Sequence, residues 1–546
     1  MNDQFLEANH LKAGAAMPFR FIPAASIDAD AANDLGWSLG VNIGSAGLNR
    51  AEPNLLDHLL YRIATLLLTT VAAWLSINAG QTGFCAEKRS VPNFIFILID
   101  DLGWADAGCF GSRYYETPNI DRLAGQGMRF TDAYAACSVC SPTRASIMTG
   151  KYPARLHLTD WIPGEGNAPA HLLRVPEWRQ FLPLEEVTIA KALKSASYVS
   201  ASIGKWHLGG PAYYPEHHGF DLNVAGTHFG HPASYFWPYE GKSHTVAGLK
   251  QGGQEGEYLT DRLTVEAEKF IEQNKDRPFF LYFAHYAVHT PLAAKPALLK
   301  KYKAKTPQGG QKNPTYAAMV ESVDDSVGRI ERKLKSLGIE RQTVVVFMSD
   351  NGGLWPMSTS NAPLRAGKGY PYEGGIREPL IIKWPGTTKS GTTCCVPVSS
   401  IDFFPTLLDV AGVKPQGEVD GRSLLPLLTQ TGVLAREALY WHYPHYWAGN
   451  RVRPFGAVRA GDWKLIEFYE DMRVELYNLK NDISESRDLA QDKPEKAAEL
   501  REMLHRWRAA VGAQMPSRNL AYRPLKAAAG ETAQLDGALV RRTAED

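Results

Sequence analysis

The chain has 546 residues, roughly three to four times the size of a typical domain, so it can form a large core and a smaller module. Lys and Arg total 59 and Asp and Glu total 58, which leaves a net charge of +1 and gives no reason to expect a nucleic-acid partner. Hydrophobic residues make up 44%, charged residues 21%, and Cys only six positions, which excludes a polytopic membrane protein, a wholly disordered chain and a disulfide scaffold.

The first ninety residues contain a segment with the pattern of an export signal. Residues 63–77 are apolar and uncharged, and small and polar residues follow from Asn78 to Gly83. This run is shorter than the roughly 20 apolar residues that span a bilayer, and it matches the roughly 7–15 of a secretory signal. We predict a periplasmic or secreted protein whose true start lies downstream of Met1, with residues 1–90 outside the folded domains. A membrane anchor through residues 63–79 and an ordinary buried helix are the alternatives.

Five continuous apolar runs predict strands that are buried on both faces, as in a parallel sheet. They span residues 93–99, 199–203, 279–284, 343–348 and 380–384. Helices are predicted between them at 264–272 and at 319–337, where apolar residues recur at intervals of 3 and 4 and Gly338 ends the pattern. This alternation predicts the α/β class, with a large, mostly parallel sheet flanked by helices.

The pattern changes near residue 430. Short strands separated by turn residues are predicted at 438–441, 455–459, 463–469 and 474–477, and an amphipathic helix at 494–511. These elements predict a small antiparallel sheet covered by one helix. We therefore divide the chain into a main domain at 91–430, a C-terminal α+β subdomain at 431–515 and a tail at 516–546.

Residues 137–151 contain a candidate reactive cysteine, Cys140. The Ser-Pro pair that follows it fits the cap and the first position of a helix, and Gly150 fits its end, so Cys140 is predicted to face a helix N-terminus, where anions bind. Arg144 lies about one helical turn away. A buried structural cysteine and a redox C-x-x-C pair are alternatives. A thiolate phosphatase is excluded, because that class has an Arg at the position that Ser146 occupies here.

Polar side chains follow two of the predicted strands. Asp100 and Asp101 come directly after the first strand, and Asp350 and Asn351 come directly after the fourth. The carboxyl ends of parallel strands meet at one edge of a sheet, where α/β proteins build their sites. Oxygen ligands with three carboxylates suit Ca²⁺ or Mg²⁺ better than Zn²⁺. Helix capping or a tight turn is the alternative for each pair.

Four basic residues complete the candidate site. Lys205 and His207 follow the strand at 199–203, and they project to the same side if the backbone stays extended. His289 follows the strand at 279–284, and Lys368 lies in a Gly-rich loop. Taken singly, each has an ordinary interpretation, as a solvated strand end, a structural histidine or a surface lysine.

In combination, these residues resemble the motifs of the sulfatase family, within the alkaline-phosphatase-like superfamily. The family's C-x-P-x-R followed by T-G-K is present at 140–151, its G-K-W-H-L-G at 204–209, its H-T-P at 289–291, and its L-R-x-G-K-x-x-x-x-E-G-G at 364–375. The motifs come in the family's order, and the resemblance extends from about residue 92 to about residue 511.

The resemblance implies a sulfatase that hydrolyses sulfate esters through formylglycine, an aldehyde made from Cys140 by a formylglycine-generating or an anaerobic sulfatase-maturating enzyme. Arg144 would bring positive charge to sulfate, while Lys205 would touch both sulfate and nucleophile. His207 would hold and deprotonate the hydrated aldehyde. His289 would bind sulfate and protonate the leaving group, and Lys368 would be the second sulfate clamp.

The resemblance also implies one bound Ca²⁺, with Mg²⁺ less favoured. Its ligands would be Asp100, Asp101, Asp350, Asn351 and the side chain derived from Cys140. Relatives that hydrolyse phosphodiesters commonly carry His in place of this Asn, so the Asn favours the calcium-dependent sulfatase branch.

Two other functions remain open. One is a phosphonate or phosphodiester hydrolase of the same superfamily, and the other is an inactive carbohydrate-binding protein in which Cys140 stays a thiol. The expected substrate is a sulfated small molecule or saccharide. Aromatic segments at 235–239 and 440–447 could line a sugar subsite, and ordinary packing is the equal alternative for them. The sequence does not indicate an oligomeric state.

Overall fold

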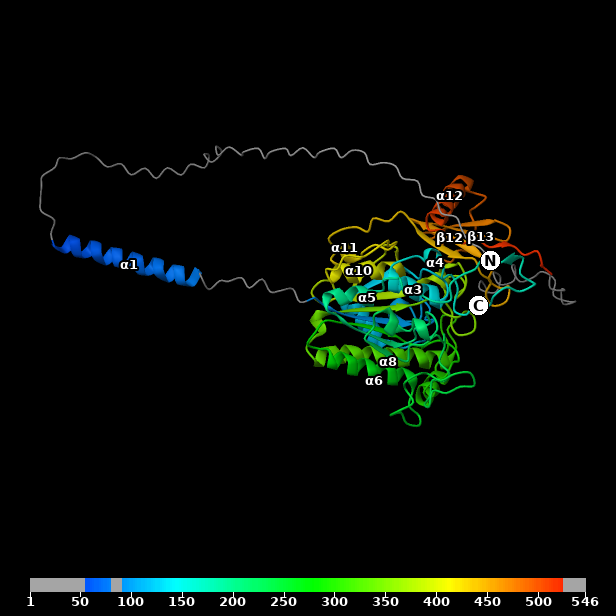
Figure 1. Ribbon diagram of the computed structural model, residues 1–546, viewed down its shortest axis with the longest axis horizontal. Helices are drawn as coiled ribbons and strands as arrows, with labels where there is room; N and C mark the ends of the chain where they lie inside the picture. Colours follow the sequence, from blue (N-terminus) through cyan, green and yellow to red (C-terminus); the bar gives the residue numbers. More distant parts are fainter. Residues whose placement is uncertain (1–54, 80–90, 524–546) are drawn as a thin grey trace, which may run out of the picture. The chain divides into compact units, whose positions relative to one another are not determined.

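The computed structural model describes residues 55–79 and 91–523. The chain forms two units, Met1–Cys85 and Ala86–Asp546 (Figure 1). Three expectations from the sequence fall outside the described residues. They concern the start of translation, the segment at 80–90 that follows the apolar run, and residues 524–546 of the predicted tail.

The first unit contains the helix α1 (Leu55–Ala79), which includes the apolar run. Its side chains are exposed where they are described, including Leu66 at 69% and Leu68 at 71%. None of the helices in the described part of the chain combines the length and the apolar character needed to cross a membrane.

The second unit is built on a nine-stranded sheet in the order β10-β2-β8-β7-β1-β6-β4-β5, with β9 beside β2. Its strands are β1 (Asn93–Ile99), β2 (Met128–Tyr134), β4 (Val199–Gly204), β5 (Leu222–Val224), β6 (Phe279–Ala284), β7 (Thr343–Ser349), β8 (Arg377–Lys383), β9 (Thr392–Cys394) and β10 (Val398–Ser399). Strand β8 runs antiparallel to both of its neighbours, β7 and β2, while β1 pairs in parallel with β6 and β7. The expectation of a large, mostly parallel sheet is therefore confirmed.

Helices cover both faces of this sheet (Figure 1). One face carries α2 (Pro118–Gln126), α6 (Leu259–Gln273), α7 (Pro296–Lys303) and α8 (Pro314–Ser336); the other carries α3 (Cys140–Thr149), α4 (Pro153–Leu156), α5 (Ile189–Leu193), α10 (Phe403–Val410) and α11 (Leu425–Leu428). Strand β1 explains why both faces are covered, because Ile95, Ile97 and Ile99 enter one core and Phe94, Phe96 and Leu98 enter the other. An apolar run without alternation thus forms a doubly buried strand.

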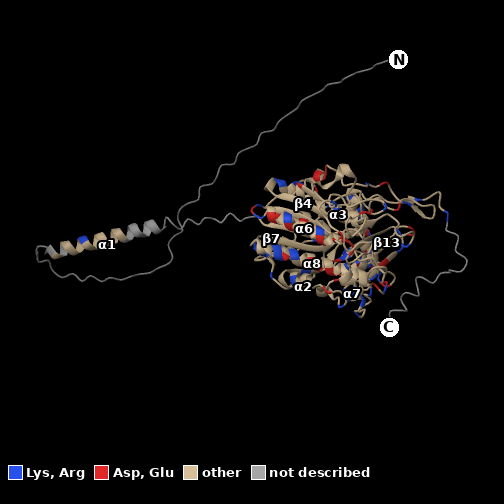
Figure 2. Cartoon of the chain, turned by 90° about the horizontal axis from the view of Figure 1, so that it is seen from below, with Lys and Arg blue, Asp and Glu red and all other residues tan. Residues whose placement is uncertain are grey.

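Short helices connect these elements. They are α9 (Glu373–Ile376) and the 3₁₀ turns η1 (Gly108–Phe110), η2 (Lys194–Ala196), η3 (Pro211–Tyr213), η4 (Pro215–His218), η5 (Glu340–Gln342) and η6 (Ser400–Asp402). On the long helices α6 and α8, Lys and Arg alternate with Asp and Glu (Figure 2), and Arg329 of α8 pairs with Glu268 of α6 at 2.5 Å.

The smaller C-terminal sheet is antiparallel, as predicted, with the order β11-β12-β13-β14. Its strands are β11 (Leu439–Tyr443), β12 (Phe455–Ala460), β13 (Trp463–Phe468) and β14 (Val474–Asn478), and α12 (Pro494–Ala510) packs on it. The other face of this sheet shares a core with Tyr134, Val139 and Ile376 of the main part. The C-terminal sheet is therefore packed against the elements that carry the candidate site.

Residues 516–523, which the sequence analysis assigns to a tail, contain a short strand. This strand, β15 (Ser517–Arg518), pairs with β3 (Leu173–Arg174). The backbone amide of Asn519 also donates to the carbonyl oxygen of Leu172 at 3.0 Å. Strands of two residues are too short to show a periodic pattern, so the sequence analysis did not predict this pair.

Candidate functional site

Helix α3 places Cys140 at its first position. The predicted cap at Ser141 is wrong by two residues, because the helix begins at Cys140 and its cap is Val139, which has no side-chain hydrogen bond. Pro142 fits inside the first turn because the amides there lack an intrahelical partner. Gly150 ends the helix at φ 70°, as predicted. Every residue of α3 is buried, Cys140 included at 3% exposure.

The two predicted strand ends do meet. Strands β1 and β7 are parallel neighbours with Ile99 opposite Ser349, which brings Asp100 and Asp350 level with each other. The Asp101 amide lies 3.3 Å from Oδ1 of Asp350. Asn351 donates from Nδ2 to Oδ1 of Asp101 at 2.7 Å. The four side chains therefore form one buried cluster.

Arg144 lies against this cluster from α3. Its Nε donates to Oδ2 of Asp350 at 2.8 Å, and its NH1 donates to the carbonyl oxygen of Lys205 at 2.9 Å. Its NH2 is 3.8 Å from Oδ2 of Asp100. The guanidinium thus connects the helix to the ends of three strands.

Lys205 and His207 both reach the site, but not by an extended backbone. Strand β4 ends at Gly204, whose φ is 101°, and a Cβ there would lie 1.9 Å from the carbonyl oxygen of Ala284. The residue His207 has a φ of 60°. The backbone therefore does not stay extended after β4, and the left-handed conformations of Gly204 and His207 set the two side chains instead. Lys205 Nζ lies 2.6 Å from Oδ2 of Asp100.

The hydrogen bonds of His207 fix its tautomer. Its Nε2 lies 2.5 Å from the carbonyl oxygen of Ile162, which can only accept, so Nε2 carries the hydrogen. The lone pair of Nδ1 then faces Cys140, whose Sγ is 3.4 Å away. Burial and the charge of Lys205 lower the pKa of His207 well below its usual range. This imidazole is a neutral base aimed at residue 140.

His289 and Lys368 reach Asp101 from two loops. Lys368 Nζ lies 2.7 Å and 2.9 Å from the two carboxylate oxygens of Asp101, and His289 Nε2 lies 3.6 Å from Oδ2. The Nδ1 of His289 donates to the carbonyl oxygen of Thr290 at 2.7 Å. Burial and the charge of Lys368 lower the pKa of His289 to about 3. By contrast, His285 is buried away from the cluster, with Nε2 3.2 Å from Oγ of Ser326.

Burial and charge act differently on the two neighbouring aspartates. Burial raises the pKa of Asp100 to about 7, against the opposing charge of Lys205. Burial also raises the pKa of Asp101, but the charge of Lys368 outweighs it and holds this pKa below its usual range. The two carboxylates are therefore compensated unequally by the protein's own cations.

The donor set fits a hard divalent cation. Two buried oxygens, Oδ1 of Asp100 and Oδ1 of Asn351, have no hydrogen-bond partner among the described residues. Such atoms are costly to bury unless something binds them. Ligand atoms of Asp100, Asp101 and His289 lie within 4.8 Å of one another, and Asp350 is adjacent. His289 thus lies directly beside the candidate ligands, a placement that the sequence analysis did not predict.

The two aromatic segments considered for a sugar subsite are largely packed inside the protein. Tyr235 and Tyr239 are buried, and the hydroxyl of Tyr235 lies 2.7 Å and 2.8 Å from the carbonyl oxygens of Tyr286 and His289. In the second segment, the residues Trp441, Tyr443 and Tyr446 are also buried. Packing is therefore the role of these residues, and Tyr235 supports the loop of His289.

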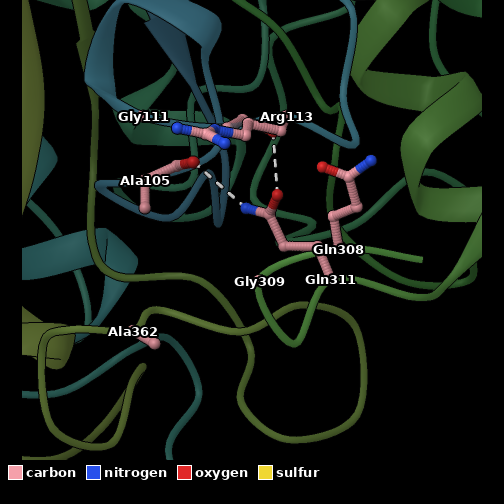
Figure 3. Close-up of a pocket in the computed structure, with 8 residues that line it drawn as sticks. Ala105, Gly111, Arg113, Gln308, Gly309, Gln311 and Ala362 are labelled. Atoms are coloured by element: carbon pink, nitrogen blue, oxygen red, sulfur yellow. Dashed lines mark hydrogen bonds between the residues drawn. The ribbon is translucent and has the colours of Figure 1, made fainter.

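A cavity of about 460 Å³ lies beside the loop that follows β1 (Figure 3). One of its walls is Gln311, whose Nε2 donates to the carbonyl oxygen of Ala105 at 3.1 Å and to Oδ1 of Asp106 at 2.9 Å. The eight described residues that line it include Arg113 but none of the predicted catalytic residues. This cavity is separate from the cluster around Cys140.

A buried ionic cluster behind the loop of Lys368 was missed by the sequence analysis. Lys464 Nζ lies 2.9 Å from Glu373 and 2.8 Å from Glu485, and all three side chains are fully buried. Glu373 also accepts from the hydroxyl of Tyr134 at 2.7 Å. No sequence pattern pairs a lysine of β13 with the E-G-G motif, because these residues meet only in the folded protein. The C-terminal sheet therefore fastens the loop that carries Lys368.

We predict that Lys464→Met lowers the free energy of unfolding by about 3–5 kcal/mol, because it leaves Glu485 buried without its counter-charge and leaves Glu373 with Arg377 alone, at 3.1 Å. Urea denaturation measures this change. The matched control is Lys496→Met, since Lys496 and Glu499 form a pair on α12 that is 34% and 55% exposed and should contribute only about 0–1 kcal/mol. Equal losses in the two variants would contradict the structural role of Lys464.

The chain is similar to known proteins over most of its length. The family model described as Sulfatase matches residues 92–413, and the model described as N-sulphoglucosamine sulphohydrolase, C-terminal, matches residues 367–510. Arylsulfatase A of Homo sapiens is 35% identical over 402 residues, which cover 68% of this chain and 74% of that protein. N-acetylgalactosamine-6-sulfatase of Rattus norvegicus is 34% identical over 444 residues, covering 76% and 78%.

The solved structure of Ps i-CgsB is similar with a TM-score of 0.66 and 32% identity, covering 77% of this chain and 93% of that chain. These matches extend over both the main sheet and most of the C-terminal sheet, and they confirm the alkaline-phosphatase-like fold expected from the motifs. The chain belongs to the sulfatase family of sulfuric ester hydrolases.

Proposed function

We propose that this sulfatase hydrolyses sulfate esters of carbohydrates through a formylglycine made from Cys140, with calcium bound beside it. The observation that carries the proposal is the surroundings of residue 140. A neutral imidazole, His207, directs its lone pair at Sγ from 3.4 Å. Arg144, Lys205 and Lys368 bring three buried cations to the same cluster.

The three cations suit an anionic substrate. A sulfate monoester carries negative charge and a poor leaving group, so its hydrolysis needs positive charge on the sulfate oxygens, an in-line nucleophile and a proton for the departing oxygen. Arg144, Lys205 and Lys368 provide the positive charge from fixed positions. Removing one such preorganised donor typically costs on the order of 2.7–4 kcal/mol of barrier.

Calcium would be held by Asp100, Asp101, Asp350, Asn351 and the side chain of residue 140. When bound, it supplies positive charge to the sulfate and to the nucleophile. The carboxylates and the two unpartnered oxygens support an oxygen-preferring cation. By family resemblance, the Asn in the fourth position supports the single-calcium sulfatase branch over the relatives that hydrolyse phosphodiesters.

The lysines have a second role in the presence of that ion. In the structure, Lys205 and Lys368 neutralise Asp100 and Asp101. With a divalent cation on the carboxylates, these ammonium groups are no longer needed as counter-charges. They are then free to bind the sulfate oxygens.

His207 is the proposed base. The hydrate of formylglycine supplies two hydroxyls on one carbon, one to attack sulfur and one that must lose its proton before sulfate leaves. Nδ1 of His207 faces residue 140 with its lone pair, and the carbonyl of Ile162 holds the ring in that tautomer. The proton therefore passes from the side chain of residue 140 to Nδ1.

His289 or Lys368 protonates the departing alcohol. Lys368 carries its protons already and contacts Asp101. His289 donates from Nδ1 to Thr290, so only its Nε2 faces the cluster, and Nε2 would have to gain a proton first. This difference favours Lys368 as the donor, and His289 would bind a sulfate oxygen only after its Nε2 gains a proton.

The carbohydrate substrate is supported by relatives. One relative is named N-acetylgalactosamine-6-sulfatase, and Ps i-CgsB has a structure in complex with k-i-k-neocarrahexaose. A phosphonate or phosphodiester hydrolase is the second candidate, favoured by the shared Cys motif. An inactive carbohydrate-binding protein is the third, and it requires an unmodified thiol at position 140.

We predict that Cys140→Ala abolishes hydrolysis of 4-nitrophenyl sulfate, because it removes the precursor of the nucleophile. Mass spectrometry of the wild-type peptide should detect an aldehyde in place of the thiol when the chain is made in a host with a formylglycine-generating or anaerobic sulfatase-maturating enzyme. The control is Cys137→Ala, which removes the other buried cysteine of the C-x-x-C pair and should keep the activity.

Three results would contradict this proposal. An unmodified thiol in every active preparation would exclude formylglycine. Faster turnover of an aryl phosphonate than of the aryl sulfate would favour the phosphonate hydrolase. Loss of activity in both cysteine variants would favour a redox pair.

We predict that dialysis against a chelator removes the activity and lowers the thermal unfolding midpoint, because the buried carboxylates lose their ligand. Added Ca²⁺ should restore both quantities, and Mg²⁺ should restore them less well. Restoration by Zn²⁺ above Ca²⁺, or activity that survives chelation, would contradict an oxygen-ligated calcium site.

We also propose that the chain is periplasmic or secreted, with the apolar run at 63–77 acting as its signal. The expected result is an exported protein whose N-terminal sequencing begins after residue 79. A mature end before Arg62 would contradict the signal, and retention in the membrane fraction would favour the anchor.

A further inference from the structure

A loop after β5 carries four rings that form a continuous wall, defined here as His228, Phe229, His231 and His244. The rings of Phe229 and His244 stack, with centroids 3.9 Å apart and planes at 15°. His228 lies 4.1 Å from Phe229, and His231 lies 5.0 Å from His244. The aromatic side chains of the wall are thus held mainly by one another.

The wall adjoins both catalytic histidines. The ring of His231 is parallel to that of His289, with an interplanar angle of 10° and a centroid distance of 6.4 Å. On the other side, a Cβ on Gly230 would lie 2.5 Å from Cε1 of His207, so the backbone of the loop packs directly on that ring. The wall therefore lies beside the place where the leaving group departs.

Unlike the buried Tyr235 and Tyr239, the wall is open to solvent. His231 is exposed, and His228, Phe229 and His244 are partly exposed. Nε2 of His244 donates to the carbonyl oxygen of His231 at 3.0 Å, which orients the ring. These side chains are therefore positioned by the fold but available to a ligand.

His231 has one free hydrogen-bonding atom. Its Nδ1 donates to the carbonyl oxygen of Pro232 at 3.1 Å, so its Nε2 carries a lone pair. Within the described part of the chain, no residue makes a hydrogen bond with that Nε2. A hydroxyl group is the simplest donor for such an acceptor.

We infer that this wall binds the sugar ring that carries the sulfate. The faces of Phe229 and the imidazoles pack against its C–H groups, and Nε2 of His231 accepts a hydrogen bond from a hydroxyl next to the sulfated position. A simple aryl or lipid alcohol could use the faces but not this acceptor. This inference rests on the proposed function and names the residues that select its substrate.

The test compares kcat/KM on two kinds of substrate in the full-length, matured enzyme. The saccharide probe is whichever of galactose 6-sulfate, glucosamine 6-sulfate and their disaccharides the wild type hydrolyses fastest, and 4-nitrophenyl sulfate is the reference. In His231→Phe, which keeps an aromatic ring but removes both nitrogens, the ratio of saccharide to aryl kcat/KM should fall about fivefold to tenfold, the value of one neutral hydrogen bond.

Two further variants complete the test. His231→Gln, which restores an acceptor, should recover part of the ratio, and a merely structural role would not give this rescue. His217→Ala removes an exposed histidine of η4 outside the wall and should leave the ratio as in the wild type.

The other outcomes separate a failure of this inference from a failure of the proposed function. An equal loss on both substrates in His231→Phe, or no change in the ratio, would overturn the inference. Hydrolysis of the aryl sulfate without hydrolysis of any saccharide would also overturn it, while the proposed sulfatase chemistry would stand. Failure of the matured wild type on every sulfate ester would instead refute the proposed function itself.

Discussion

Three buried carboxylates and three buried cations face one another at the carboxyl edge of the main sheet. Asp100, Asp101 and Asp350 pair with Lys205, Lys368 and Arg144, respectively, and each of these side chains is less than a tenth exposed. Buried charges of one sign are costly, and in this structure each set offsets the charge of the other. The cations come from α3, from the turn after β4 and from a loop before β8, and the balance therefore depends on the whole fold being closed around it.

The sequence was sufficient to predict the framework that holds these charges. The apolar runs at 93–99 and 343–348 are β1 and β7, which pair in parallel. Because apolar and polar residues do not alternate in these runs, both strands are expected to be buried on both faces, as in a parallel sheet. Because side chains at the ends of such strands share one edge, Asp100 and Asp350 could be placed together from their positions in the chain alone. The motifs then supplied the other members of the site.

The details that failed have local causes. The turn at Gly204 depends on the close approach of the Ala284 carbonyl, which is a contact between strands and leaves no mark in the sequence around Lys205. The position of Cys140 inside α3 depends on Val139 acting as a cap without a polar side chain. The cluster of Lys464 and Glu373 joins residues far apart in the chain. In each case tertiary contacts determine the local structure, and these contacts cannot be predicted from the pattern of residues along the chain.

The depth at which Cys140 lies has a consequence for the order of events in biosynthesis. Helix α3 is enclosed on all sides, and almost the whole of its first residue is covered. A macromolecular catalyst cannot approach a side chain in that position, so any enzymatic conversion of the thiol has to finish before the helix docks against the sheet. Under the proposed formylglycine mechanism, molecules that fold before this conversion would keep the thiol and stay inactive. The yield of active enzyme would then depend on the rate of conversion relative to the rate of folding.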